Sequence, residues 1–178
     1  MRLESNPPSG KHEPLKVDVT IVGAGPVGLL SAYLARLCGL RVMIVDKSSE
    51  PVRVGRADAL NARTSQFLEI INLFADIHPS AKACNTSSVW GNGEFKSRQS
   101  TWWENLEGCF HKHFLMLGQP VIEALLNRKL AELQAPVLRN TSVESVCMDG
   151  GTCLSTLSSG SIVESQFVIG ADGSRSMV

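Results

Sequence analysis

A glycine-rich turn between an apolar run and a helix-forming segment constrains the fold of this chain most. Residues 17–22 form a short β-branched run, typical of a buried strand, and the pattern G-x-G-x-x-G follows at residues 23–28. Helix formers occupy residues 26–38, and Gly39 indicates where that helix ends. A second apolar run at residues 41–46 is typical of another strand. This order predicts a βαβ unit with parallel strands.

The glycine turn has the spacing of a dinucleotide-binding loop. Its first glycine permits a tight turn, its second a close approach of a pyrophosphate to the backbone, and its third tight packing of helix on strand. Asp46 stands 18 residues after Gly28, where a carboxylate accepts hydrogen bonds from ribose hydroxyls. The candidate cofactor-binding residues here are Gly23, Ala24, Gly25, Pro26, Val27, Gly28 and Asp46. The turn alone does not separate FAD from NAD, and a glycine turn used only for packing is the alternative.

Composition and charge favour small-molecule chemistry. The 178 residues suffice for one domain or slightly more. Lys and Arg together number 17, as do Asp and Glu, so the formal net charge is zero. Such a balance offers no electrostatic footprint for a nucleic acid or an anionic membrane, and we predict neither as a partner.

Cysteine usage and the N-terminal segment bear on the compartment. Five cysteines form no C-x-x-C pair, and an odd number argues against a disulfide framework, so we expect a reducing, cytoplasmic location. Residues 1–16 are polar and lack the apolar centre of a signal peptide, which predicts a disordered lead-in. Cys109, His111 and His113 alternate along the chain, but a closed metal site needs about four ligands, so we predict no metal.

The rest of the chain predicts further helices and strands. Helix-forming patterns span residues 61–74 and 119–133. Residues 87–117 lack a helical period and contain turn signals, so we expect extended strands there. Strand-like segments separated by turn residues follow at residues 137–138, 143–148, 152–157 and 162–170. We interpret the last three as a small antiparallel meander that returns to the sheet.

Two further segments complete an ordered triplet with the glycine turn. They are Gly-Arg-Ala-Asp-Ala-Leu-Asn-Ala-Arg-Thr at residues 55–64 and Val-Ile-Gly-Ala-Asp-Gly-Ser-Arg-Ser-Met-Val at residues 168–178. With this triplet the chain resembles the FAD-dependent aromatic hydroxylases, the phenol 2-monooxygenase-like group of flavoprotein monooxygenases. The resemblance implies an α/β fold: a Rossmann-like FAD-binding domain with a parallel sheet plus a small antiparallel meander, truncated before the rest of the substrate domain. Residues 17–178 are then a partial FAD-binding domain, with residues 84–118 as an excursion toward the substrate domain.

The same resemblance implies roles for residues outside the glycine turn. Arg56 and the adjacent Ala57 are expected beside the flavin, where a guanidinium matches anionic oxygens. Asp58 corresponds to the acid that faces the substrate hydroxyl and draws off its proton; the alternative is that it caps the following helix. Gln119 is expected to reach the ribityl or phosphate region of FAD, the alternative being an ordinary polar residue at a helix start. Asp172 is expected on the cofactor side, unless it only fixes its own turn.

The function implied is an FAD-dependent monooxygenase, or the N-terminal part of one. It would use NAD(P)H as co-substrate and O₂ to hydroxylate a small phenolic or aromatic substrate, in a role that would suit secondary metabolism. One alternative is a catalytically inactive fragment that binds FAD or ADP, and a weaker one is an NAD-dependent dehydrogenase. The choice between NADH and NADPH, the substrate's identity and the oligomeric state are open at this point.

Overall fold

The chain is divided into two units. The computed structural model describes residues 13–53, 57–101 and 103–178. The first unit contains the residues up to 49 and those from 130 to 178, and the second contains residues 50–129. The predicted excursion at residues 84–118 falls inside the second unit, and Arg56 lies outside the described residues. Each unit is described separately.

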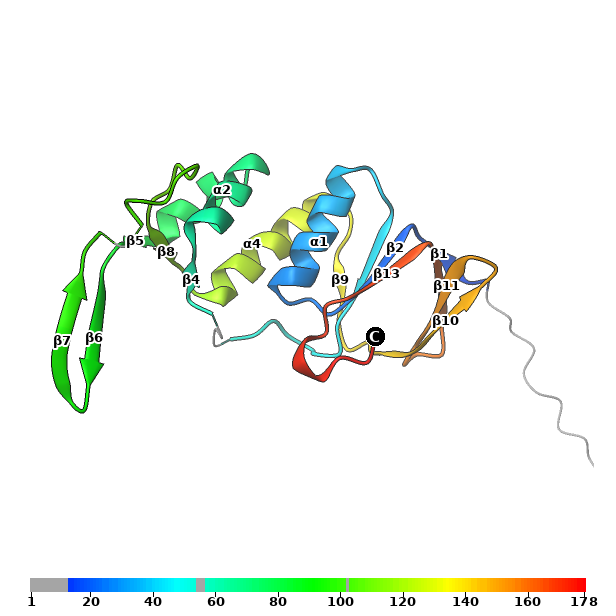
Figure 1. Ribbon diagram of the computed structural model, residues 1–178. Helices are drawn as coiled ribbons and strands as arrows, with labels where there is room; N and C mark the ends of the chain where they lie inside the picture. Colours follow the sequence, from blue (N-terminus) through cyan, green and yellow to red (C-terminus); the bar gives the residue numbers. More distant parts are fainter. Residues whose placement is uncertain (1–12, 54–56, 102) are drawn as a thin grey trace, which may run out of the picture. The chain divides into compact units, whose positions relative to one another are not determined.

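The first unit is built on a four-stranded parallel sheet (Figure 1). Its strands in chain order are β2 (Val19–Val22), β3 (Val42–Val45), β9 (Val137–Leu138) and β13 (Phe167–Gly170), arranged β13-β2-β3-β9. Helix α1 (Pro26–Leu37) connects β2 to β3 and packs against both. The predicted βαβ unit and α/β fold class are thereby confirmed. The side chains of β2 are all buried, because helix and meander residues cover the apolar run.

An antiparallel meander completes the first unit. Its strands are β10 (Val143–Asp149), β11 (Thr152–Leu157) and β12 (Ile162–Ser165), and β1 (Leu15–Lys16) pairs with β12 in parallel. The structure confirms the predicted meander. The prediction of one continuous strand at residues 162–170 is wrong, because this segment forms two strands, β12 and β13. The chain changes sheets at Gln166, whose N–H donates to the Asp18 carbonyl, so that β12 stays in the meander and β13 joins β2. Strand β1 lies within the range predicted as a disordered lead-in.

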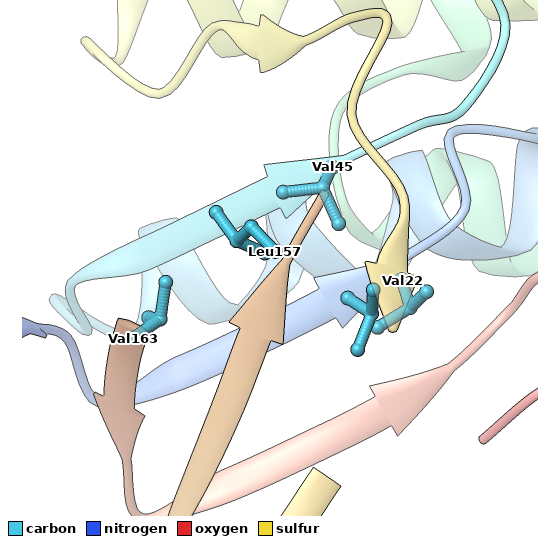
Figure 2. Close-up of a cluster of buried hydrophobic side chains, with 5 residues drawn as sticks. Val22, Val45, Leu157 and Val163 are labelled. Atoms are coloured by element: carbon cyan, nitrogen blue, oxygen red, sulfur yellow. The ribbon is translucent and has the colours of Figure 1, made fainter. Parts of the chain in front are cut away.

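The meander and the parallel sheet share one hydrophobic core. Figure 2 shows Val22 of β2 and Val45 of β3 facing Leu157 and Val163 of the meander, and Val143 completes the cluster. All five are at most 7% exposed. Burial of side chains of this size contributes about 1.5–3 kcal/mol each. The core therefore fixes the meander against the sheet that carries the glycine turn.

The second unit contains short helices and antiparallel strands. Helices α2 (Ala62–Ile70) and α3 (Phe74–Ile77) precede the short 3₁₀ helix η1 (His78–Ser80). Strands β4 (Ala59–Leu60), β8 (Phe114–Met116) and β5 (Lys82–Cys84) form one sheet, and β6 (Ser87–Gly91) and β7 (Glu94–Gln99) form a hairpin. The single helix predicted at residues 61–74 is wrong. The chain leaves the helix after Ile70 because Asn72 has a φ of 58°, in the left-handed region.

Helix α4 (Gln119–Glu132) begins in the second unit, and its last residues are counted with the first. Its bounds agree with the predicted helix at residues 119–133. The described residues contain no helix that is both long and apolar enough to cross a membrane. All five cysteines are free thiols. A short 3₁₀ helix, η2 (Gly173–Arg175), follows β13 near residue 178.

Candidate functional site

The four strands of the parallel sheet, β13-β2-β3-β9, all end at the same edge of that sheet. Gly23 follows β2, Asp46 follows β3, Arg139 follows β9, and Asp172 follows β13 by two residues. Ligands of open α/β sheets bind at this carboxyl edge, because the strand ends and the following loops form a crevice there. The edge therefore collects the predicted glycine turn, two of the predicted acids and one arginine.

Two glycines of the turn are required by close backbone contacts. Gly23 has a φ of 102°, and a Cβ there would overlap the Ala171 carbonyl and lie 2.9 Å from Asp172 Cα. A Cβ on Gly28 would overlap the carbonyl oxygen of Gly23 and lie 3.3 Å from Ala171 Cβ. The turn, the start of α1 and the segment after β13 thus pack backbone on backbone. These contacts place Asp172 directly beside the glycine turn.

Gly25 differs from the other two because the space beside it is open. A Cβ built on Gly25 meets no described heavy atom within 4 Å, and the φ of −75° at Gly25 is accessible to any residue. Gly25 is also the N-cap of α1, and Pro26 occupies the first turn of that helix. The first N–H groups of a helix lack partners within the helix and attract anions. The space beside Gly25 therefore fits a phosphate group approaching the backbone.

The Asp46 carboxylate is fixed by backbone donors. Its Oδ2 accepts a hydrogen bond from Ala24 N at 2.6 Å, and its Oδ1 accepts one from Ser48 N at 2.7 Å. The side chain is 15% exposed. Each carboxylate oxygen has two acceptor sites, so both oxygens retain capacity for a further donor. The acid is thus held beside the glycine turn, where hydroxyl donors of a nucleotide ribose would meet it.

The Asp172 carboxylate closes the turn that follows β13. Ser176 Oγ donates to its Oδ1 at 2.7 Å, and Met177 N donates to its Oδ2 at 2.6 Å. Partial burial acts to raise the pKa of Asp172, but the hydrogen bonds from Ser176 and the backbone outweigh it and hold that pKa below its ordinary value. The carboxylate therefore stays ionised at the edge of the site while it fixes its own turn.

The predicted residues of the second unit form a separate group. The Asp58 carbonyl accepts a hydrogen bond from Leu117 N at 2.9 Å, and Asp58 Oδ1 lies 3.9 Å from the position of a Cβ on Gly118. Strand pairing between β4 and β8 thus brings Asp58 beside the start of α4. The helix-cap interpretation of Asp58 is wrong, because Asn61 caps α2 by accepting from Thr64 N. Ala57 is exposed beside Asp58.

Gln119 and Glu123 form a buried pair on α4. Gln119 is 9% exposed and Glu123 only 1%. Gln119 Nε2 donates to Glu123 Oε1 at 2.7 Å, and Val52 N approaches Glu123 Oε2 at 3.4 Å. Residues four apart on a helix face each other, so Glu123 orients the Gln119 amide. Sequence reasoning missed Glu123; the i, i+4 spacing from Gln119 was its only signal.

The histidines of the second unit belong to an aromatic cluster. His111 Nε2 lies 2.9 Å from Glu69 Oε2, and its ring stacks on Phe74 with centroids 4.2 Å apart. Burial lowers the pKa of His113, and the nearby His111 and His78 lower it further. Within the described ranges, no three His, Cys, Asp or Glu side chains are placed to hold a metal ion.

Comparison with known families agrees with the geometry of the carboxyl edge. The family model described as "FAD binding domain" matches residues 16–178. The chain belongs to the FAD-binding domain family. The FAD-binding domain expected from the sequence resemblance is thereby confirmed. The glycine turn, Asp46 and Asp172 all lie within its matched residues.

The FAD-binding domain is similar to parts of several larger monooxygenases. It is 30% identical over 161 residues to rifampicin monooxygenase of Streptomyces venezuelae, covering 90% of this chain and 33% of that protein. Over 170 residues it is 31% identical to the 12-dehydrotetracycline 5-monooxygenase/anhydrotetracycline 6-monooxygenase of Streptomyces rimosus, covering 92% and 32%. The solved structure of the anhydrotetracycline hydroxylase OxyS from Streptomyces rimosus has a TM-score of 0.80 at 27% identity, covering 92% and 33%. The chain thus spans about a third of the length of these relatives.

Proposed function

We propose that this chain is the FAD-binding part of a monooxygenase that uses NAD(P)H and O₂ to hydroxylate a small aromatic molecule. The observation that carries the proposal is the carboxyl edge of the sheet. There Gly25 leaves open space at the start of α1, and Asp46 stands next to the same turn. The relatives named above as monooxygenases support the reaction class, and para-nitrophenol 4-monooxygenase of a Pseudomonas strain, 30% identical over 165 residues, supports an aromatic substrate.

The residues of the first unit fit the adenosine diphosphate portion of FAD. The open space beside Gly25 and the N–H groups of the first turn of α1 would receive the pyrophosphate, with Ala24 to Gly28 forming the loop around it. Asp46 would accept from ribose hydroxyls. Asp172 would lie at the same edge, beside Gly23. When bound, the flavin supplies the oxygen-transfer chemistry, and the chain's residues hold and orient it.

Asp58 is the residue of this chain to which we assign proton removal from a phenolic substrate. Its side chain is exposed, and it does not cap α2, so its carboxylate is not committed to that helix. Strand β4 holds it against Leu117 and Gly118, immediately before Gln119. A positioned carboxylate of this kind contributes about 10²–10⁴-fold as a general base. Gln119, whose amide is oriented by Glu123, and Arg56 are proposed as flavin ligands.

Binding of FAD or ADP without turnover is the second candidate function. The observation that favours it is a group of exposed apolar side chains on the first unit, with Met148 69% and Phe167 64% exposed beside a shallow pocket. Exposed apolar area of this kind marks an interaction surface or makes a protein prone to association. A chain of this type would bind nucleotide and associate, and would not oxidise NAD(P)H. The five free thiols favour a reducing, cytoplasmic location for either function.

The experiment that separates the two candidates follows NAD(P)H oxidation by the FAD-loaded protein. NADH and NADPH are each supplied with and without simple phenols, and the hydroxylated product is sought. Oxidation stimulated by a phenol, with product, supports the monooxygenase. Flavin binding with no stimulated oxidation supports the binding-only function. Asp58→Asn then tests the proton role: if the variant hydroxylates a phenol as fast as the parent protein, Asp58 is not the base.

A further inference from the structure

Arg139 stands next to Asp46 at the carboxyl edge of the parallel sheet. It directly follows β9, and three backbone hydrogen bonds tie its segment to the segment after β3. Asp46 N donates to Leu138 O at 2.9 Å, Thr141 N to Asp46 O at 3.0 Å, and Asn140 N to Ser48 O at 3.3 Å. The backbone positions of Arg139 and Asp46 are therefore fixed relative to each other.

The guanidinium of Arg139 makes no hydrogen bond to any residue that the structure describes. Its Nη1 lies 3.8 Å from Asp46 Oδ1, which is longer than a hydrogen bond. Its Nη2 is buried and has no hydrogen-bond partner among the described residues. The side chain is only 18% exposed. A buried donor without a partner costs free energy on folding, and the ion pair of Nη1 with Asp46 leaves that cost at Nη2 in place.

Two other arginines of the first unit, Arg36 and Arg41, behave differently. Arg36 donates through Nε and Nη2 to the Leu133 carbonyl and through Nη1 to the Leu40 carbonyl. Arg41 donates through Nε and Nη2 to the Asp18 carboxylate. Both side chains serve the fold with well-formed hydrogen bonds. Arg139 makes no comparable contribution, so its position at the ligand edge calls for another partner.

We propose that Arg139 is a ribose-binding residue that works together with Asp46. This inference rests on the proposed binding of FAD in the first unit. A carboxylate only accepts hydrogen bonds and a guanidinium only donates them, whereas a hydroxyl does both. A ribose hydroxyl placed at the gap between Nη1 and Oδ1 donates to Asp46 and accepts from Arg139. Asp46 alone accepts the hydrogen bond that the hydroxyl donates, and it leaves the acceptor lone pairs of the hydroxyl without a donor.

The competing explanation is that Arg139 is only a counter-charge for Asp46. In that case the arginine affects the fold and the general affinity for nucleotide, and it does not distinguish a ribose from a deoxyribose. A ribose-binding residue, in contrast, loses its partner when the hydroxyl is removed from the ligand. The two explanations therefore predict different affinities when a variant of Arg139 is tested with a deoxy nucleotide. Loss of a counter-charge weakens the binding of every nucleotide equally, whereas loss of a ribose-binding residue weakens only those that carry the hydroxyl.

The test measures binding of ADP, 2′-deoxy-ADP and 3′-deoxy-ADP by calorimetry to the parent chain and to Arg139→Met. The parent is expected to prefer ADP over at least one deoxy analogue by about tenfold or more, as for a hydrogen bond to a charged group. Arg139→Met is expected to lower ADP affinity and to reduce that preference several-fold. Arg139→Lys, which keeps the charge but not the planar fork, is expected to restore the preference only in part.

Arg41→Met is the matched control. It removes an arginine–aspartate pair from the same unit, at the amino ends of β2 and β3, and is expected to leave the ribose preference unchanged. If Arg139→Met weakens ADP and both deoxy analogues by one common factor, or leaves all three unchanged, the inference is wrong while the proposed function stands. If the parent chain binds neither ADP nor FAD, the proposed function itself fails.

Discussion

Alanine substitutions at Gly25 and Gly28 are expected to differ in effect: Gly28→Ala loses stability, whereas Gly25→Ala keeps its stability and loses nucleotide binding. A Cβ on Gly28 overlaps the Gly23 carbonyl and lies 3.3 Å from Ala171 Cβ, so the backbone must move. Overpacking of this kind costs about 1–3 kcal/mol. For a chain of this size that lowers Tm by about 2–12 °C. A Cβ on Gly25 meets no described atom within 4 Å, and its φ of −75° needs no strain.

Gly25→Ala is therefore expected to unfold within a few degrees of the parent and to bind nucleotide poorly. The added methyl occupies the space in which the pyrophosphate would approach the backbone. A clash of about 1–3 kcal/mol corresponds to a loss of ADP affinity of about 5- to 150-fold. Thermal unfolding monitored by circular dichroism gives Tm, and calorimetric titration with ADP gives Kd. Gly25→Ala binding ADP as tightly as the parent would refute the assignment of the turn as the pyrophosphate site.

Three further predictions concern single side chains. Asp46→Asn is expected to weaken ADP binding about tenfold in titration calorimetry and to weaken 2′-phosphorylated ADP less, because the charge that repels a 2′-phosphate is gone. The pKa of His113 is lowered by burial and by His111, so the folded protein binds fewer protons than the unfolded chain. The stabilisation that comes from this difference is complete above the ordinary pKa of 6.5 and is lost as the pH falls below it. Urea unfolding at several pH values should show the loss in the free energy of unfolding, and the loss should be smaller in His113→Gln. Hydrogen bonds from Arg41 lower the pKa of Asp18 from 3.8 to about 2, so their stabilisation is complete above pH 3.8 and is lost as the pH falls toward 2. Asp18→Asn should lose less stability than the parent over that acid range, and an equal loss would contradict the assignment.

The elements of the first unit were predictable because their signals are local. The glycine turn joins a β-branched run to a helix-forming segment that Gly39 follows, and these adjacent patterns define β2, α1 and β3. The meander follows from turn residues at regular intervals. Its last strand was predicted too long, because no turn residue stands between β12 and β13 and only tertiary pairing separates them at Gln166.

The break between α2 and α3 was not predictable from periodicity. Apolar residues continue on both sides of Asn72, so the helical pattern runs through the break. Asn tolerates a positive φ, which allows the chain to turn there, but this tolerance does not require a turn. Phe67 and Ile70, two of the apolar residues in this pattern, are 59% and 69% exposed, so the pattern does not indicate a buried helix face either.

The candidate site was predictable where it depends on short spacing. The turn and Asp46 are linked through one βαβ unit, so 18 residues of separation suffice to indicate their contact. Arg139 was missed because it reaches Asp46 through the pairing of β9 with β3, two strands that are far apart in sequence. Strand β9 has only two residues, and its position at the edge of the sheet has no local signal.

The central claim is that the first unit binds FAD through its adenosine diphosphate end. The most direct measurement loads the purified chain with FAD, removes free flavin by gel filtration, and records the flavin absorption of the protein peak before and after addition of ADP. We expect flavin absorption to travel with the protein and ADP to displace it. Flavin that elutes entirely apart from the protein, together with no heat of binding for ADP, would contradict the account.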